Sequence, residues 1–151
     1  MTSKKRSGAN SRSKPLKPPV FFIDRSLGKK AVADALRQAN LEVHVHDEHF
    51  PSDARDEEWL AEVGRRGWVV LTKDTRIRYR TAELAALMRA RVTAFVLTSG
   101  NLRGAEMAEI FLKALPAICR LVARYAPPFV ASVTKSGSIS LLVRSSQKKA
   151  R

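Results

Sequence analysis

Residues 20–24 read VFFID, so four apolar residues lead directly into an aspartate. A short apolar run bounded by polar residues is typical of a strand that is buried on both faces, as parallel strands are. The aspartate, Asp24, would then lie at the carboxyl edge of a sheet, where α/β folds gather their ligands. The pattern recurs at residues 68–74, WVVLTKD, which end in Asp74. Two strands that each end in an aspartate predict two parts of an acidic metal site.

Strand and helix patterns alternate along most of the chain. We expect strands at 20–24, 41–46, 68–72 and 92–97, and helices at about 27–39, 57–66, 81–91 and 104–125. Thr81 is the expected N-cap of its helix, and Pro116 should kink the last one. A hairpin follows, with strands at 129–134 and 138–143.

This alternation predicts an α/β fold, a three-layer sandwich with a mainly parallel central sheet, a long C-terminal helix and a terminal hairpin. A strand order of 2-1-3-4 would place the first and third strands side by side. Their carboxyl ends, which carry Asp24 and Asp74, would then form the topological switch point of the sheet.

The chain is strongly basic, and most of the excess charge lies at its ends. The 151 residues carry 28 Lys+Arg and 14 Asp+Glu, a net charge of +14. Residues 1–19 hold six of the basic residues and no acid, and residues 144–151 hold four more, which leaves +4 between them. We therefore expect a basic disordered tail at 1–19, one folded domain at 20–143 and a second basic tail at 144–151. Such a balance favours a polyanionic partner, with nucleic acid ranked first and an anionic membrane surface second.

Other totals limit the class of protein. The single cysteine, Cys119, excludes an intrachain disulfide and fits a reducing cytoplasm. No apolar run approaches the roughly 18 residues of a membrane span, and the basic N-terminus lacks the apolar segment of a secretory signal. We expect a cytoplasmic protein with no membrane partner.

Topology places a third carboxylate beside the first two. The chain leaves the second strand at the carboxyl edge and must return through the helix at 57–66 to begin the third strand at the opposite edge. The start of that helix, with Asp56 and Glu57, therefore lies on the same side as Asp24 and Asp74. Three carboxylates that are distant in sequence are thus expected to converge on one rim.

Carboxylates this close need a counter-charge. Two unit charges about 4 Å apart repel by roughly 4 kcal/mol at an effective dielectric near 20, so the cluster requires a cation or proton uptake. Hard oxygen ligands suit Mg²⁺ or Mn²⁺, which would activate water and hold a scissile phosphate. The residues expected to contact a nucleic-acid backbone are the basic neighbours Arg25, Lys29, Lys73, Arg76 and Arg78.

Ordinary structural roles stay open for the same residues. Asp24 and Asp56 could cap the helices that follow them, and Asp74 could be a turn residue. The basic run at 73–80 could be a solvated face. The joint placement of the acids favours the metal site over these separate explanations.

Three histidines lie in or just after the second strand pattern. On an alternating strand His44 and His46 point the same way, which could suit two zinc ligands, with His49 close behind. With Val43 and Val45 buried, however, we expect both strand histidines to face solvent.

These motifs resemble those of the PIN-like nuclease domains, especially the VapC-type toxin-like branch of small bacterial proteins. The matching pieces are FIDRSLG at 22–28, DEEWL at 56–60 and VLTKD at 70–74. The resemblance covers about residues 20–100 and implies that Asp24, Asp56 and Asp74 are the metal-binding acids of a ribonuclease. PIN domains usually add a fourth acid near the end of the next strand, whereas residues 98–101 read TSGN here.

The sequence therefore predicts a Mg²⁺- or Mn²⁺-dependent endoribonuclease that hydrolyses RNA phosphodiester bonds. The resemblance further implies the toxin of a toxin–antitoxin pair, with a cognate antitoxin as protein partner and a homodimer as a frequent assembly. The alternative is a nucleic-acid-binding module with a degenerate acidic site, which the missing fourth acid favours. A receiver-like phosphotransfer domain fits less well, because a receiver needs paired acids where Asp24 is followed by Arg25.

Overall fold

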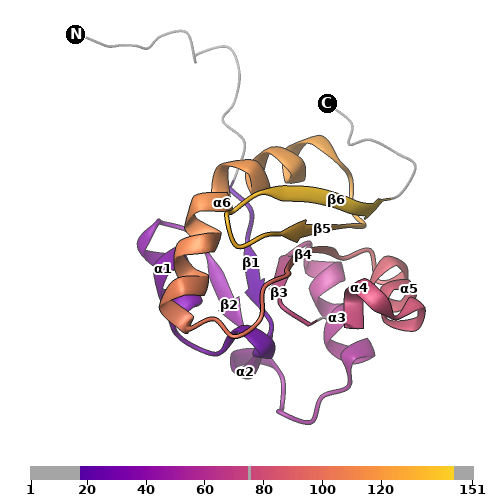
Figure 1. Ribbon diagram of the computed structural model, residues 1–151. Helices are drawn as coiled ribbons and strands as arrows, with labels where there is room; N and C mark the ends of the chain where they lie inside the picture. Colours follow the sequence, from indigo (N-terminus) through magenta and orange to yellow (C-terminus); the bar gives the residue numbers. More distant parts are fainter. Residues whose placement is uncertain (1–17, 75, 145–151) are drawn as a thin grey trace, which may run out of the picture.

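A single twisted sheet organises the computed structural model, which describes residues 18–74 and 76–144 (Figure 1). Within these residues the sheet has six strands in the order β2-β1-β3-β4-β5-β6. The strands are β1 (Phe21–Ile23), β2 (Val43–Val45), β3 (Val69–Thr72), β4 (Thr93–Leu97), β5 (Phe129–Val133) and β6 (Ile139–Arg144). All neighbours are parallel except β5 and β6, which form the antiparallel hairpin. The predicted 2-1-3-4 order and the terminal hairpin are confirmed.

Helices cover both faces of the sheet, so the predicted three-layer sandwich is also confirmed. On one face lie α1 (Ala31–Gln38) and the long α6 (Gly104–Arg124). On the other lie α3 (Asp56–Arg66), α4 (Arg76–Tyr79) and α5 (Thr81–Arg89) (Figure 1). Two short elements, the 3₁₀ turn η3 (Arg25–Leu27) and the helical turn α2 (His46–His49), follow the carboxyl ends of β1 and β2.

Strand β1 is apolar throughout because it contributes to both layers of the core. Phe21 and Ile23 pack in the cluster under α1 and α6, whereas Phe22 belongs to the cluster under α3. The ring of Phe22 stacks with two indoles, with ring centroids 5.4 Å apart for Trp59 and 6.0 Å apart for Trp68. Burial on both faces explains why the strand shows no polar alternation.

Helix α6 continues through Pro116, and its axis changes direction along its length (Figure 1). A proline inside a helix removes one backbone hydrogen bond and commonly bends the axis, as the sequence predicted. Among the described residues, no helix combines the length and the apolar composition needed to cross a membrane. The predicted basic tails lie almost entirely outside the described residues.

Three local predictions are wrong. Thr81 is the first residue of α5, and Arg80 takes the N-cap position because it is the single residue between α4 and α5. We expected His44 and His46 both to face solvent, but His46 is buried, because the strand ends at Val45 and His46, in α2, packs against Phe22 and Trp59. Where we expected one helix at 27–39, α1 begins only at Ala31.

Candidate active site

The two aspartates at the strand ends lie on neighbouring strands. Residues Ile23 of β1 and Leu71 of β3 are paired in register, and the backbone N–H of Asp24 donates to the Leu71 carbonyl at 3.0 Å. The next residues along each strand therefore leave the sheet at the same edge. The convergence that was predicted for Asp24 and Asp74 follows directly from this parallel pairing.

Hydroxyl groups hold the Asp24 carboxylate in place. Its Oδ2 accepts from the Ser26 hydroxyl at 2.7 Å, from the Thr72 hydroxyl at 2.8 Å and from the Ser26 backbone N–H at 3.3 Å. Asp24 is thus the N-cap of η3 as well as a candidate site residue. Among the described residues nothing donates to its Oδ1, which leaves one oxygen free to bind a ligand.

The same hydroxyls tie the chain after β3 to the chain after β1. The backbone N–H of Lys73 donates to Ser26 Oγ and that of Asp74 donates to Thr72 Oγ1, both at 3.0 Å. Thr72 is fully buried. Thr72 can be buried at the end of an apolar strand because its hydroxyl both donates, to Asp24, and accepts, from the Asp74 N–H.

Arg76 neutralises the other two acids. Its Nε and Nη2 donate to the two oxygens of Asp74 at 3.0 and 2.6 Å, and its Nη2 lies 3.6 Å from Asp56 Oδ2. Asp56 also accepts from the indole N–H of Trp59 at 3.1 Å. Burial acts to raise the pKa of Asp74, but the hydrogen bonds from Arg76 outweigh it and hold that pKa below its usual value.

All three predicted acids line two hollows that share this rim. Asp24, Asp56, Asp74 and Trp59 belong to both hollows, whose volumes are about 340 and 370 Å³. One hollow extends over apolar side chains of α3, α4 and α5, including Leu60, Ile77 and Leu87, and the other is polar. The acids and bases of the polar hollow suit a phosphate together with a cation, and the apolar hollow beside it suits an organic group attached to that phosphate.

The predicted basic residues divide into two groups. Arg25, Lys73 and Arg76 line the polar hollow beside the acids. Lys29 does not: it forms an ion pair with Asp47 at 3.1 Å and lines a separate hollow. Arg78 lies in α4, but its side chain is outside the described part of the structure.

Sequence reasoning missed several residues of the site. Glu83, in the first turn of α5, lines the apolar hollow together with Glu57. Residues 98–101, where a fourth acid would be expected, line neither hollow. Ser26 and Thr72 each stand two residues from Asp24 or Asp74 in the sequence, and that spacing was the available signal.

The fold and the site together define a class of α/β domains. In this class a mainly parallel sheet carries one acid at the end of β1, a second at the start of α3 and a third after β3. Residues 19–99 match the family described as "PIN like domain". The chain belongs to this family, and its resemblance to the VapC-type branch is confirmed.

A curated relative extends the match beyond these residues. Over 126 residues the chain is 28% identical to the "Putative ribonuclease VapC45" of Mycobacterium tuberculosis (strain ATCC 25618 / H37Rv). The aligned region covers 81% of this chain and 91% of the relative. No solved structure matches the chain.

Proposed function

We propose that this protein is a metal-dependent endoribonuclease and the toxin of a toxin–antitoxin pair. The observation that carries the proposal is the convergence of Asp24, Asp56 and Asp74 on one rim, beside Arg25 and Lys73. The relative named as a putative ribonuclease supports the choice of RNA as substrate. The catalytic unit is proposed to span residues 20–143, with the basic ends adding affinity for RNA through their charge.

The donor set fits a hard divalent cation. Carboxylate oxygens from three separate elements surround one hollow, and Oδ1 of Asp24 is free of other contacts among the described residues. Such oxygen ligands match Mg²⁺ and Mn²⁺. When bound, the ion supplies an activated water and positive charge for the scissile phosphate.

The remaining residues position these groups. Ser26 and Thr72 orient the Asp24 carboxylate through their hydroxyls. Arg25 and Lys73, on the rim of the polar hollow, bind the RNA phosphates. Arg76, which holds both oxygens of Asp74, would move part of this contact to a substrate phosphate if Asp74 held a cation.

Glu83 is our candidate for the fourth acid. It reaches the rim from α5 rather than from the end of β4, and its side chain is 25% exposed. Its only ion pair among the described residues is a long one with Arg80, at 3.8 Å. A carboxylate that is largely buried and weakly paired is well placed to complete a cation site.

The decisive experiment is cleavage of total RNA by the purified chain with Mg²⁺, Mn²⁺ or EDTA. We expect metal-dependent cleavage that falls at least about 100-fold in Asp24→Asn, because the variant keeps the shape of the side chain and removes its charge. Asp53→Asn, which changes an exposed acid outside both hollows, is the matched control. Glu83→Gln in the same assay tests the fourth acid, and full activity would remove Glu83 from the set.

RNA binding without cleavage in any metal would instead support the binding-module alternative. The observation that favours it is the bidentate contact of Arg76 with Asp74, which satisfies that acid without a metal. The cytoplasmic location, the antitoxin and the homodimer are proposals from the family. Light scattering of the purified chain measures its mass, and co-expression with the product of a neighbouring gene tests for the antitoxin.

A further inference from the structure

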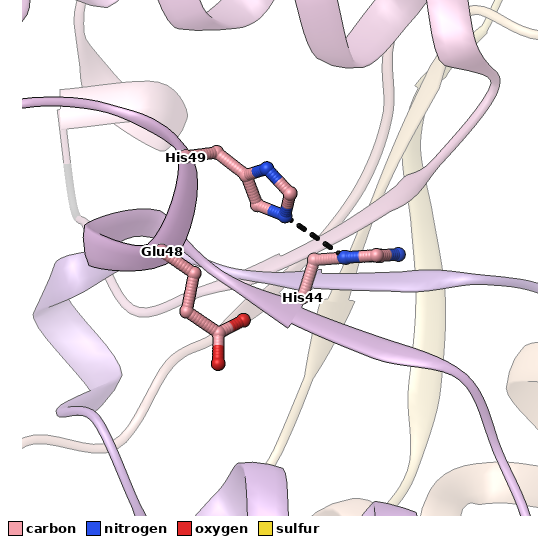
Figure 2. A group of neighbouring side chains, drawn as sticks. All are labelled: His44, Glu48 and His49. Carbon is pink, nitrogen blue, oxygen red and sulfur yellow. Dashed lines mark hydrogen bonds between the residues drawn. The ribbon is translucent and has the colours of Figure 1, made fainter.

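A second group of possible ligands lies at the edge of the sheet, apart from the aspartates. His44 of β2 and His49 of α2 approach each other, and Glu48 of α2 lies beside them (Figure 2). His44 Nδ1 and His49 Nε2 are 2.9 Å apart. Neither histidine lines the two acidic hollows. The nuclease proposal leaves this group without a role.

The ring of His44 is fixed by two independent contacts. Its Nε2 lies 2.7 Å from a carboxylate oxygen of Glu42, and its plane stacks on Trp68 with ring centroids 4.0 Å apart and 8° between the planes. A carboxylate on Nε2 favours the proton there, so Nδ1 carries the lone pair that points toward His49. A carboxylate–histidine pair of this kind is the usual support of a metal-binding imidazole.

The third possible ligand comes from the same turn of chain. Donor atoms of His44, Glu48 and His49 all lie within 4.8 Å of one another. Glu48 is already held by the Val45 N–H at 3.0 Å and by Arg37 at 3.3 Å from each oxygen. Two ligand atoms on a tetrahedral Zn²⁺ are about 3.3 Å apart, so the histidine nitrogens must separate by a few tenths of an ångström and turn toward a common point. The Glu48 carboxylate must move closer, because the donor atoms now spread over up to 4.8 Å.

We propose that His44 Nδ1, His49 Nε2 and the Glu48 carboxylate bind a divalent transition metal of the Zn²⁺ class, with water in the fourth position. The metal replaces the hydrogen bond between the two imidazoles, and the proton that His49 carries on Nε2 moves to its Nδ1, so both rings stay neutral. Imidazole ligands select such metals over Mg²⁺, so this site and the aspartate site differ in their preferred ion. The bound ion would fasten α2 to β2, and α2 begins with His46, which lines the polar hollow.

The test uses the full chain with Asp24→Asn and Asp74→Asn, so that the acidic centre does not contribute. Zn²⁺ is titrated by calorimetry, and Co²⁺ is titrated by its visible absorption, whose intensity distinguishes tetrahedral from octahedral binding. We expect one Zn²⁺ per chain, an intense Co²⁺ spectrum, and no heat with Mg²⁺. The result does not depend on whether the protein cleaves RNA.

Variants separate ligands from their support. His49→Asn, at an exposed position, should weaken Zn²⁺ binding at least about 100-fold, and Glu42→Gln, which leaves all three ligands in place, by about 10-fold. Circular dichroism checks that each variant is folded. Undiminished Zn²⁺ affinity in His49→Asn, a Co²⁺ spectrum that stays weak, or no Zn²⁺ binding by the parent chain would each overturn the proposal.

Discussion

Asp24 shows how much of this site depends on two hydroxyl groups. One comes from the turn that follows Asp24 itself and the other from the neighbouring strand, and both donate to the same oxygen. A carboxylate with one oxygen fixed and one free has a defined direction in which to bind a cation. Supporting contacts of this kind typically change metal affinity 10- to 100-fold when they are removed.

Thr72→Val tests this support at the scale of one residue. The variant keeps the branched shape of a fully buried side chain and removes the hydroxyl that donates to Asp24. We expect Mn²⁺ affinity to fall about 10-fold and the free energy of unfolding to fall by about 1 kcal/mol. Thr72→Ser keeps the hydroxyl and is the control. Equal Mn²⁺ affinity in the valine and wild-type proteins would show that Thr72 does not support the site.

The basic residues divide for a reason that the sequence does not contain. Lys29 and Lys73 are equivalent by type, but Lys29 pairs with Asp47 from the loop after β2, whereas Lys73 follows β3 at the centre of the sheet. Which lysine meets the acids depends on strand order and on ion pairs between distant segments. Spacing alone therefore predicted the aspartates better than it predicted their basic neighbours.

Among the elements, predictability followed the strength of the hydrophobic pattern. β1 and β3 are buried on both faces, so their apolar runs had one interpretation. The four-residue helices α2 and α4 complete too few turns to show a helical period, and no helix was predicted in either stretch. Because α4 was missed, the N-cap of α5 was assigned one residue too late, to Thr81.

The packing of α3 against the end of α5 leads to a prediction at the scale of elements. A Cβ added to Gly64 of α3 would lie 1.9 Å from the backbone oxygen of Ala90, which cannot move aside as a flexible side chain can. Gly64→Ala should therefore destabilise the protein by about 1–3 kcal/mol, despite the better helix propensity of alanine.

Urea unfolding followed by circular dichroism measures this effect as a lower midpoint. Gly100→Ala is the control, because a Cβ there meets nothing within 4 Å. A midpoint for Gly64→Ala equal to or above that of the wild type would mean that α3 and α5 are not in close contact.

For the molecule as a whole, charge is distributed very unevenly. Residues 1–17 alone carry six Lys/Arg, and the stretch between the two basic ends has a net charge of only +4. Binding of an RNA strand releases counterions in proportion to the phosphates that are neutralised. The basic end should therefore add affinity without adding base specificity.

Removal of residues 1–17 should weaken RNA binding and flatten its salt dependence. With six fewer positive charges, the slope of log K against log salt should fall by up to about 4 for a single strand. Fluorescence anisotropy with a labelled RNA over a range of salt concentrations measures this slope. A chain of unchanged length with the six Lys/Arg replaced by Gln separates charge from length, and an unchanged slope in both chains would refute an electrostatic role.

The parallel pairing of β1 with β3 also sets when Asp24 and Asp74 can first come together during synthesis of the chain. Asp24 leaves the ribosome about 50 residues before Asp74. Thr72, whose hydroxyl donates to Asp24, is made only two residues before Asp74. Parallel strands need a crossover between them, so β2 and α3 must both be in place before the two strand ends meet. Pairing between distant segments is slow and forms late. A nascent chain therefore keeps Asp24 and Asp74 apart at least until residues 20–74, which include β1, β2, α3 and β3, have all been made.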